Sequence, residues 1–238
     1  MEVMHIRFLG GCAVSAAVLC LMLGAPAAAS AQSDEADRIW DSAQVLQAIM
    51  RADDAGVPRS VMSNVDAIAI FPSTVRGGFI FGAHRGRGII SARDVRTGEW
   101  SLPAFLTITG ASFGLQIGGQ ATDIMLLIMN RRGLDRILGN QFKIGADASV
   151  AAGPVGRSAA VATDLLLTAE ILSYSRSRGL FAGVSLEGST VRSDRDANER
   201  YYDYPYETRD IILERQPSPP DGEVALEGWF EMLAEHAR

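Results

Sequence analysis

The stretch AIAIFPSTVRGGFIFGAHRGRGIISAR, residues 67–93, decides the fold class, because the hydrophobic pattern changes to a period of two where it begins. Alternation of this kind is typical of β-strands, and the Pro and Gly residues within it are typical of strand ends and turns. Three short strands are therefore predicted, at residues 67–71 (ended by Pro72), 78–82 and 88–93, with the last two joined by a turn at Gly86-Arg87-Gly88.

The strand pattern continues beyond this stretch. Residues 106–120 form a long Gly-bearing strand or strand pair, and 122–130 are apolar on both faces, as in a central strand. A short helix is expected at 131–138, and further strands at 143–152, 163–177 and 180–192. Many strands with few helices between them favour an antiparallel sheet or barrel. We therefore predict an α+β fold with a curved, Gly-rich antiparallel β-sheet or barrel-like core and helices at both ends.

The two terminal helices are predicted from a different period. In residues 34–54 the apolar side chains of Ile39, Ala43, Leu46 and Met50 recur on one helical face, which favours packing on the domain. The alternative, a helix lying on a membrane, fits poorly because its polar face is acidic. A last amphipathic helix is expected at 224–236, with Leu226, Phe230 and Leu233 on one face.

The first 31 residues resemble a secretory signal peptide. A short basic head precedes an apolar run from Gly10 to Leu23, and Ala29-Ser30-Ala31 fits a cleavage site. We therefore expect an exported protein that starts at Gln32 and is periplasmic or secreted, with peripheral attachment to a membrane as an alternative. Both cysteines, Cys12 and Cys20, lie in this leader, so no disulfide or thiolate site is expected in the mature chain. Acylation of Cys12 is a minor alternative.

The expected organisation has four parts: a signal peptide at 1–31, a helical segment at 32–65, a β-rich domain at 66–203, and a tail with a linker and a helix at 204–238. The net charge of −6 is unevenly spread, because residues 76–178 carry 12 basic against 7 acidic side chains while both flanking regions are acidic. A net acidic chain is a poor nonspecific binder of nucleic acid, whereas a basic patch can meet anionic lipid headgroups.

Arginines dominate the basic central region. A guanidinium group can donate a pair of hydrogen bonds to a phosphate group. The simpler interpretation of such a cluster is that the arginines lie on the solvent-exposed face of a hairpin and form ion pairs with nearby acidic residues. The candidate lipid- or anion-binding residues are Arg76, Arg85, Arg87, Arg93, Arg131 and Arg132.

Other chemistry is weakly indicated. Gly110-Ala111-Ser112-Phe113-Gly114 matches the G-x-S-x-G pattern of hydrolases, but the residues that follow are poor helix formers. Four carboxylates on neighbouring predicted strands could hold a hard cation, although no recognised metal-binding spacing occurs: Asp147, Asp164, Glu170 and Glu187. No phosphate-binding loop is present. We therefore expect neither a catalytic site, nor a metal, nor a cofactor.

Four stretches resemble the SYLF domain family: AIAIFPSTVRGGFIFG, GEWSLPAFLTITGASFGLQIGGQATDIMLLIMN, FKIGADASVAAGPVGR and YSRSRGLFAGVSLEGS. Together they cover about residues 66–203. The family includes the actin-binding domain of a yeast actin-patch protein. The resemblance implies a noncatalytic module that binds anionic lipids, and its eukaryotic members bind phosphoinositides and in some cases actin. Because this chain carries an export signal, we do not expect cytosolic actin or phosphoinositides as partners.

The sequence thus predicts noncatalytic binding of lipid or an anionic membrane surface, with the Arg76–Arg96 hairpin as the headgroup contact. The alternative is a structural or envelope protein-interaction module, with self-association, that binds no lipid.

Overall fold

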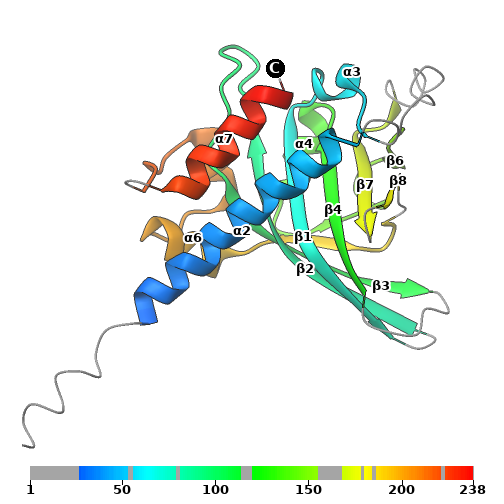
Figure 1. Cartoon of the computed structure of the whole chain (residues 1–238), viewed down its shortest axis with the longest axis horizontal. Coiled ribbons are helices and arrows are strands. Elements are labelled where there is room, and N and C mark those ends of the chain that lie inside the picture. Colours follow the sequence, from blue (N-terminus) through cyan, green and yellow to red (C-terminus); the bar gives the residue numbers. More distant parts are fainter. Residues whose placement is uncertain are drawn as a thin grey trace, which may run out of the picture.

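The computed structural model describes residues 27–52, 56–78, 81–113, 120–154, 168–177, 180–183, 186–220 and 223–237. Figure 1 shows a curved sheet with helices laid against it. The helical elements are α2 (Ala27–Met50), α3 (Arg59–Met62), α4 (Arg131–Ile137), α6 (Arg195–Tyr202), the π-helix η2 (Asp210–Glu214) and α7 (Val224–His236). The strands are β1 (Ala67–Gly78), β2 (Phe81–Ala92), β3 (Ala104–Phe113), β4 (Gln120–Ile128), β5 (Phe142–Lys143), β6 (Val150–Ala152), β7 (Ile171–Ser177), β8 (Leu180–Gly183) and β9 (Thr190–Ser193).

All of these strands belong to one sheet, in the order β5-β9-β3-β2-β1-β4-β7-β6, with β8 also paired to β7. Neighbouring strands are antiparallel except for β6 and β7, which are parallel. The predicted α+β fold with a curved, mainly antiparallel sheet and terminal helices is therefore confirmed. The short helix predicted at 131–138 is present as α4.

The two long central strands differ from the prediction. β1 does not end at Pro72 but continues to Gly78, and Gly86-Arg87-Gly88 lies inside β2 rather than in a turn. The register of β1 shifts at Pro72 against both of its neighbours, and Ser73 adopts a left-handed φ of 47°. Proline cannot donate a ladder hydrogen bond, so a central strand accommodates it only at such a bulge.

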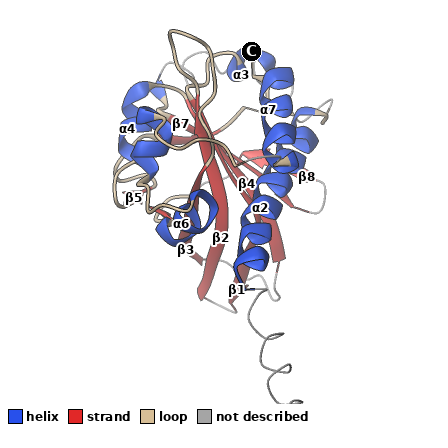
Figure 2. Ribbon diagram, turned by 90° about the vertical axis from the view of Figure 1, so that its left-hand side faces the viewer, coloured by secondary structure: helices blue, strands red, loops and turns tan. Residues whose placement is uncertain are grey.

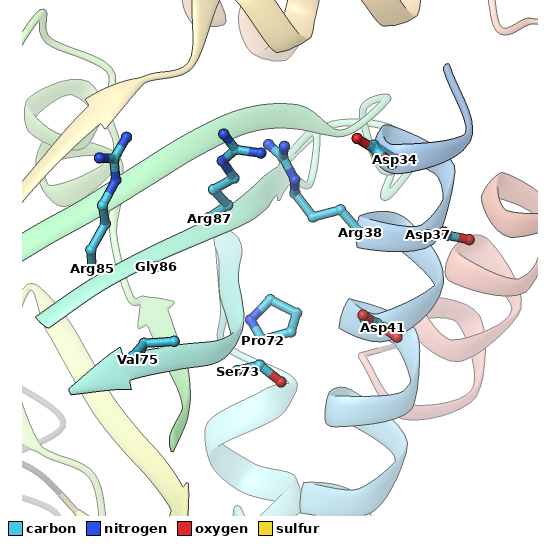
Figure 3. Close-up of a pocket in the computed structure, with 10 residues that line it drawn as sticks. All are labelled: Asp34, Asp37, Arg38, Asp41, Pro72, Ser73, Val75, Arg85, Gly86 and Arg87. Carbon is cyan, nitrogen blue, oxygen red and sulfur yellow. The ribbon is translucent and has the colours of Figure 1, made fainter. Parts of the chain in front are cut away.

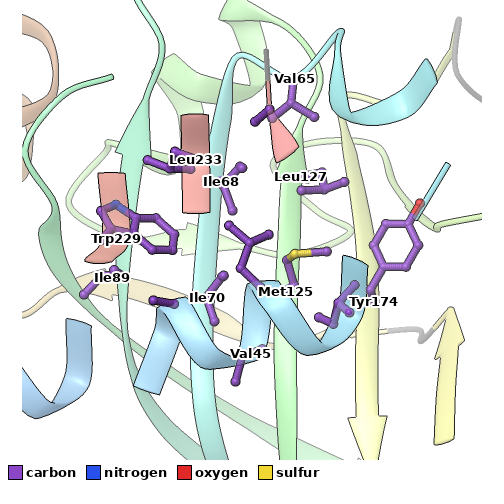
Figure 4. Close-up of a cluster of buried hydrophobic side chains, with 14 of the residues drawn as sticks. Val45, Val65, Ile68, Ile70, Ile89, Met125, Leu127, Tyr174, Trp229 and Leu233 are labelled. Atoms are coloured by element: carbon purple, nitrogen blue, oxygen red, sulfur yellow. The ribbon is translucent and has the colours of Figure 1, made fainter. Parts of the chain in front are cut away.

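The upper half of the sheet is buried on both faces. On one face α2 and α7 cover a cluster that includes Ile70, Ile89 and Met125 (Figure 4). On the other face α4 and η2 cover a second cluster that includes Phe71 and Leu126, and Figure 2 shows α4 on the opposite side of the sheet from α7. Helices on both faces explain why residues 67–71 are apolar at every position, since neither face of β1 meets water there.

Both terminal helices pack on the domain. The face of α2 with Ile39, Ala43 and Leu46 is buried as predicted, whereas Trp40 is 47% exposed. In α7 the fully buried aromatic residue is Trp229, which the sequence pattern did not single out, and the predicted Phe230 is only partly buried. Within the described residues, no helix is long and apolar enough to cross a membrane.

Gly88 allows β1 and β2 to approach closely. A Cβ atom added there would lie 2.1 Å from the carbonyl oxygen of Ile70, which is backbone and cannot rotate away. We expect Gly88→Ala to lower the free energy of unfolding by about 1–3 kcal/mol, as overpacking of a core does. Urea denaturation followed by circular dichroism measures this change.

Gly228 provides the matched control for this substitution. In α7 an added Cβ would meet only the ring of the half-exposed Trp40, at 3.3 Å, and alanine favours the helix over glycine. Gly228→Ala should therefore leave stability unchanged or raise it. Equal losses in the two variants would contradict the close approach at Gly88.

Candidate functional site: an arginine face and the groove beside it

Beyond the helices, the ends of β1, β2 and β3 project as a bare part of the sheet (Figure 1). Side chains alternate between the faces of a strand, so Arg85 and Arg87 lie on the same face as the buried Ile89. Both arginines are exposed, and the neighbouring Val75, opposite Arg85 in the ladder, is 60% exposed. The face that α2 and α7 cover at one end of the sheet is thus open at the other.

A third arginine joins this open face from a distant part of the sequence. Thr107 of β3 pairs with Arg87 on one side and with Arg192 of β9 on the other, and paired residues point to the same face. We call the exposed side chains of Arg85, Arg87 and Arg192 the arginine face. In the part of the chain that the structure describes, none of these three makes an ion pair. Arg192 was not among the residues predicted from the sequence, because no local pattern links β9 to β2.

Arg76 lies on β1 next to this region. Its backbone pairs with His84 of β2 and with Gln120 of β4. Its side chain lies outside what the structure describes, so Arg76 is placed by strand register alone.

A groove of about 490 Å³ separates the arginine face from the beginning of α2. Arg85 and Arg87 line one side, and Asp34, Asp37 and Asp41 line the other (Figure 3). The bulge at Pro72 and Ser73 forms part of the wall between them. We call this feature the charged groove.

Arg38 also lines the charged groove, where Figure 3 shows it extending from α2 toward Arg87, and its role is structural. Its guanidinium is 3.0 Å from Asp194 and 3.5 Å from Glu35, and it stacks 5.1 Å from the ring centroid of Phe105. Burial lowers the pKa of Arg38 below its ordinary value, although Asp194 and Glu35 oppose that shift. Arg200 also binds Glu35, at 2.7 Å. This buried network fixes the start of α2 against α6 and so positions the acidic side of the groove.

The other candidate arginines lie elsewhere. Arg93 donates to the backbone carbonyls of Ser63 and Ala237, at 2.9 and 3.4 Å. Arg131 is 3.4 Å from Asp135, and Arg132 is 3.8 Å from Glu170. The structure brings Arg93 and Arg131 together with Arg96 and Arg215 around a separate cavity of about 300 Å³.

The Arg76–Arg96 hairpin is therefore not one contact surface. Arg85 lies in β2 and Arg93 directly follows that strand, so the two are eight residues apart along extended chain, which corresponds to about 26 Å. Arg93, Arg131 and Arg132 have protein partners, whereas Arg85 and Arg87 have no ion-pair partner among the described residues. Of the predicted residues, Arg85 and Arg87 remain available to an anion on the open face of the sheet.

The remaining polar motifs do not form a catalytic or metal site in the described residues. Ser112 lies near the end of β3, where its backbone pairs with Gly82 of β2, and residues 114–119, which complete the G-x-S-x-G pattern and follow it, lie outside the described residues. His84 lies 3.1 Å from the hydroxyl of Ser189, but Ser189 is fully buried and meets no solvent. Glu170 binds Arg136 at 2.8 Å, and no group of three potential metal ligands occurs among the described residues, while Asp164 lies outside them.

Comparison with known proteins gives consistent matches. The family model described as "Ysc84: Las17-binding protein actin regulator" matches residues 109–231. The chain is 33% identical over 175 residues to human "SH3 domain-containing YSC84-like protein 1", covering 73% of this chain and 51% of that protein.

Two yeast proteins are similarly related. "Protein YSC84" of Saccharomyces cerevisiae is 31% identical over 195 residues, covering 78% of this chain and 41% of that protein. "LAS seventeen-binding protein 3" of the same yeast is 32% identical over 189 residues, covering 77% and 39%. The chain thus spans about half or less of the length of these relatives, whose names describe binding or regulatory proteins.

Proposed function

The chain belongs to the Ysc84 family, whose domain is the SYLF domain, and from this premise we propose that it binds the phosphate groups of an anionic membrane surface without catalysis. The observation that carries the proposal is the arginine face, where Arg85, Arg87 and Arg192 are exposed and have no ion-pair partner among the described residues.

The chemistry of this face suits lipid phosphate. Guanidinium groups donate paired hydrogen bonds to phosphate oxygens, and three of them on a rigid sheet need no reordering of the backbone. Exposed Val75 lies beside Arg85, so an apolar contact next to the headgroup is available. Such a contact is mainly electrostatic and weakens when salt screens the charges.

Charge reversal on the arginine face is expected to weaken membrane binding strongly. We expect the purified protein to sediment with phosphatidylglycerol vesicles at low salt, and to do so less at 1 M salt, where the screening length is about 3 Å. Arg85→Glu with Arg87→Glu should lower the bound fraction at least about tenfold, since basic residues near an anionic membrane contribute about 1 kcal/mol each. Co-sedimentation measures the bound fraction.

The second arginine group supplies the matched control. Arg96→Glu with Arg131→Glu makes the same change in net charge at the separate cavity, which shares no lining residue with the charged groove. We expect the control to retain most of the binding. An equal loss in both double variants, or a loss in the control alone, overturns the assignment of the arginine face.

Docking of a partner protein is the second candidate function. It is favoured by the relatives' names, since the family model and one yeast relative are named for binding Las17. For this chain the corresponding function would be to bind another protein of the cell envelope, and the simplest case is binding to a second copy of itself. A light-scattering mass well above 25.5 kDa, together with no sedimentation on any vesicle, favours this function over lipid binding.

A further inference from the structure

Four arginines from three separate segments of the chain line one cavity of about 300 Å³ near the end of β2. Arg93 and Arg96 come from the turn after β2, Arg131 from the start of α4, and Arg215 from the end of η2. We call this feature the arginine cavity. Among the described residues that line it, the only acidic one is Asp94, so its lining carries an excess of positive charge.

Two of these guanidinium groups are held in place by neutral acceptors. Arg215 donates to the backbone carbonyls of Glu99 and Trp100, at 2.8 and 3.4 Å, and Arg93 likewise donates to two backbone carbonyls. A carbonyl oxygen carries no net charge, so these hydrogen bonds position the guanidinium groups and leave their charges uncompensated. Neither arginine makes an ion pair with a described residue.

Asp94 is engaged mainly by the backbone of its own turn. Its carboxylate accepts the backbone N–H groups of Arg96 and Thr97, at 2.8 and 3.4 Å, whereas the Arg96 guanidinium lies 3.8 Å away and is 90% exposed. The N–H of Arg96 is the largest cause of the low pKa of Asp94, and the charges of Arg96 and Arg215 lower it further. Asp94 thus stays ionised and holds the turn together, but it is one carboxylate beside two arginines.

The acids near Arg131 compensate its charge incompletely. Asp135 lies 3.4 Å from Arg131 and 3.7 Å from Arg209, so two arginines share one carboxylate. Burial raises the pKa of Asp66, against the opposing charges of Arg93 and Arg131, and therefore disfavours its negative form. The arginine cavity thus keeps an excess of positive charge after these acids are counted.

Arg215 reaches the cavity through an uncommon backbone conformation. η2 is a π-helix, and Arg215, which follows it, has a left-handed φ of 52° that residues with a side chain rarely adopt. Both features recur at functional sites, where the surrounding structure maintains a conformation that local preference disfavours. They indicate a role for Arg215 beyond ending a helix.

We propose that the arginine cavity binds a phosphomonoester, a compact group that carries about 1.5 to 2 negative charges at pH 7. Arg93 and Arg215 supply fixed positive charge. The exposed side chains of Arg96 and Arg131 can turn onto the phosphate, because their present ion pairs are solvent-exposed and weak. The arginine cavity shares no lining residue with the charged groove, so this binding is independent of the membrane contact at the arginine face.

The rest of the lining suits the organic part of such an ester. The buried side chains of Leu134 and Ile212 line the cavity together with the arginines. Apolar walls of low dielectric constant strengthen the attraction between the arginines and an anion. A volume of about 300 Å³ is at the lower end of the range for small-molecule sites, which favours a small phosphate ester.

The test compares glycerol 3-phosphate, a phosphomonoester, with glycerophosphoglycerol, a phosphodiester that has one negative charge. We expect the purified protein to bind the first at least about five-fold more tightly in isothermal titration at low salt, because the additional charge is attracted to the arginines. Arg96→Gln with Arg131→Gln should weaken the binding of glycerol 3-phosphate at least about five-fold, since each lost contact is modest. Equal affinity for the two compounds, or no binding of glycerol 3-phosphate, overturns the inference.

Arg51→Gln with Lys143→Gln is the matched control. It makes the same change in net charge at exposed positions that line neither the arginine cavity nor the charged groove. This variant should keep the affinity for glycerol 3-phosphate. An equal loss in both double variants would show that net charge, rather than the cavity, attracts the anion, and would overturn the assignment.

Vesicles distinguish a lipid-borne phosphomonoester from a soluble one, with phosphatidic acid and phosphatidylglycerol compared at equal surface charge. Stronger sedimentation with phosphatidic acid that Arg96→Gln with Arg131→Gln removes supports the cavity with a lipid as its source. Equal sedimentation with both lipids, together with binding of glycerol 3-phosphate that depends on the same two arginines, supports the cavity with a soluble source.

The failure of this inference and that of the proposed function give different results. Sedimentation with phosphatidylglycerol that is lost in Arg85→Glu with Arg87→Glu, without any binding of glycerol 3-phosphate, overturns this inference alone. Binding of glycerol 3-phosphate without sedimentation on any vesicle overturns the proposed function alone.

Discussion

Replacement of Trp229 by alanine is expected to lower the free energy of unfolding by about 3–5 kcal/mol, the range for removing a large aromatic side chain from a core. Trp229 is fully buried where α7 meets the sheet (Figure 4), and its indole N–H donates to the hydroxyl of Ser91 at 2.9 Å. The substitution creates a cavity and leaves the buried Ser91 hydroxyl without this donor. Chemical denaturation followed by circular dichroism measures the loss.

Trp40 is the matched control for this prediction. It is also a tryptophan on a helix of the same layer, but 47% of its surface is exposed. We expect Trp40→Ala to cost about 1 kcal/mol or less, as surface substitutions do. Trp229→Phe should fall between the two, because the ring volume is largely kept and the hydrogen bond is lost. If both alanine variants lose the same stability, α7 does not depend on Trp229 for its packing.

Replacement of Glu35 by alanine is expected to cost about 3–5 kcal/mol, as the removal of one partner from a buried ion network does. The carboxylate of Glu35 is 1% exposed and lies 2.7 Å from Arg200 and 3.5 Å from Arg38. Without it, the buried guanidinium of Arg38 keeps only Asp194 as a charged partner. Thermal and urea denaturation of the variant check the loss.

Glu231 serves as the control, because it is exposed on α7 and makes no ion pair with a described residue. Glu231→Ala should change stability by less than about 0.5 kcal/mol. A loss for Glu35→Ala no larger than that would mean that water replaces the carboxylate at no cost, and that the network does not fix the start of α2.

The amino-acid sequence was sufficient for the fold class. Period-two alternation and frequent turn residues predicted a curved, mainly antiparallel sheet, and helical periodicity predicted α2 and α7, because both patterns depend on local geometry. Four sequence blocks identified the family, which the family match over residues 109–231 confirms. Lipid binding and export remain predictions.

The same local patterns gave wrong predictions where the conformation that a residue adopts depends on its neighbours in the sheet. Pro72 indicated a strand end because proline lacks an N–H, but the bulge at Ser73 carries β1 past it. Gly86 and Gly88 indicated a turn, yet they lie inside β2, where their lack of a side chain makes room for Thr74 and for the Ile70 backbone. In both cases the packing partner comes from another strand.

The sequence by itself determined that the chain has an excess of basic side chains between residues 76 and 178, since these can be counted directly. Only the tertiary structure decided which of them act together. The extended β2 strand (Phe81–Ala92) separates Arg85 from Arg93, β9 brings Arg192 onto the same face as Arg87, and α2 lines the other side of the charged groove. The physical reason is that strand pairing and helix packing join residues more than 40 positions apart, and no local pattern encodes those distances.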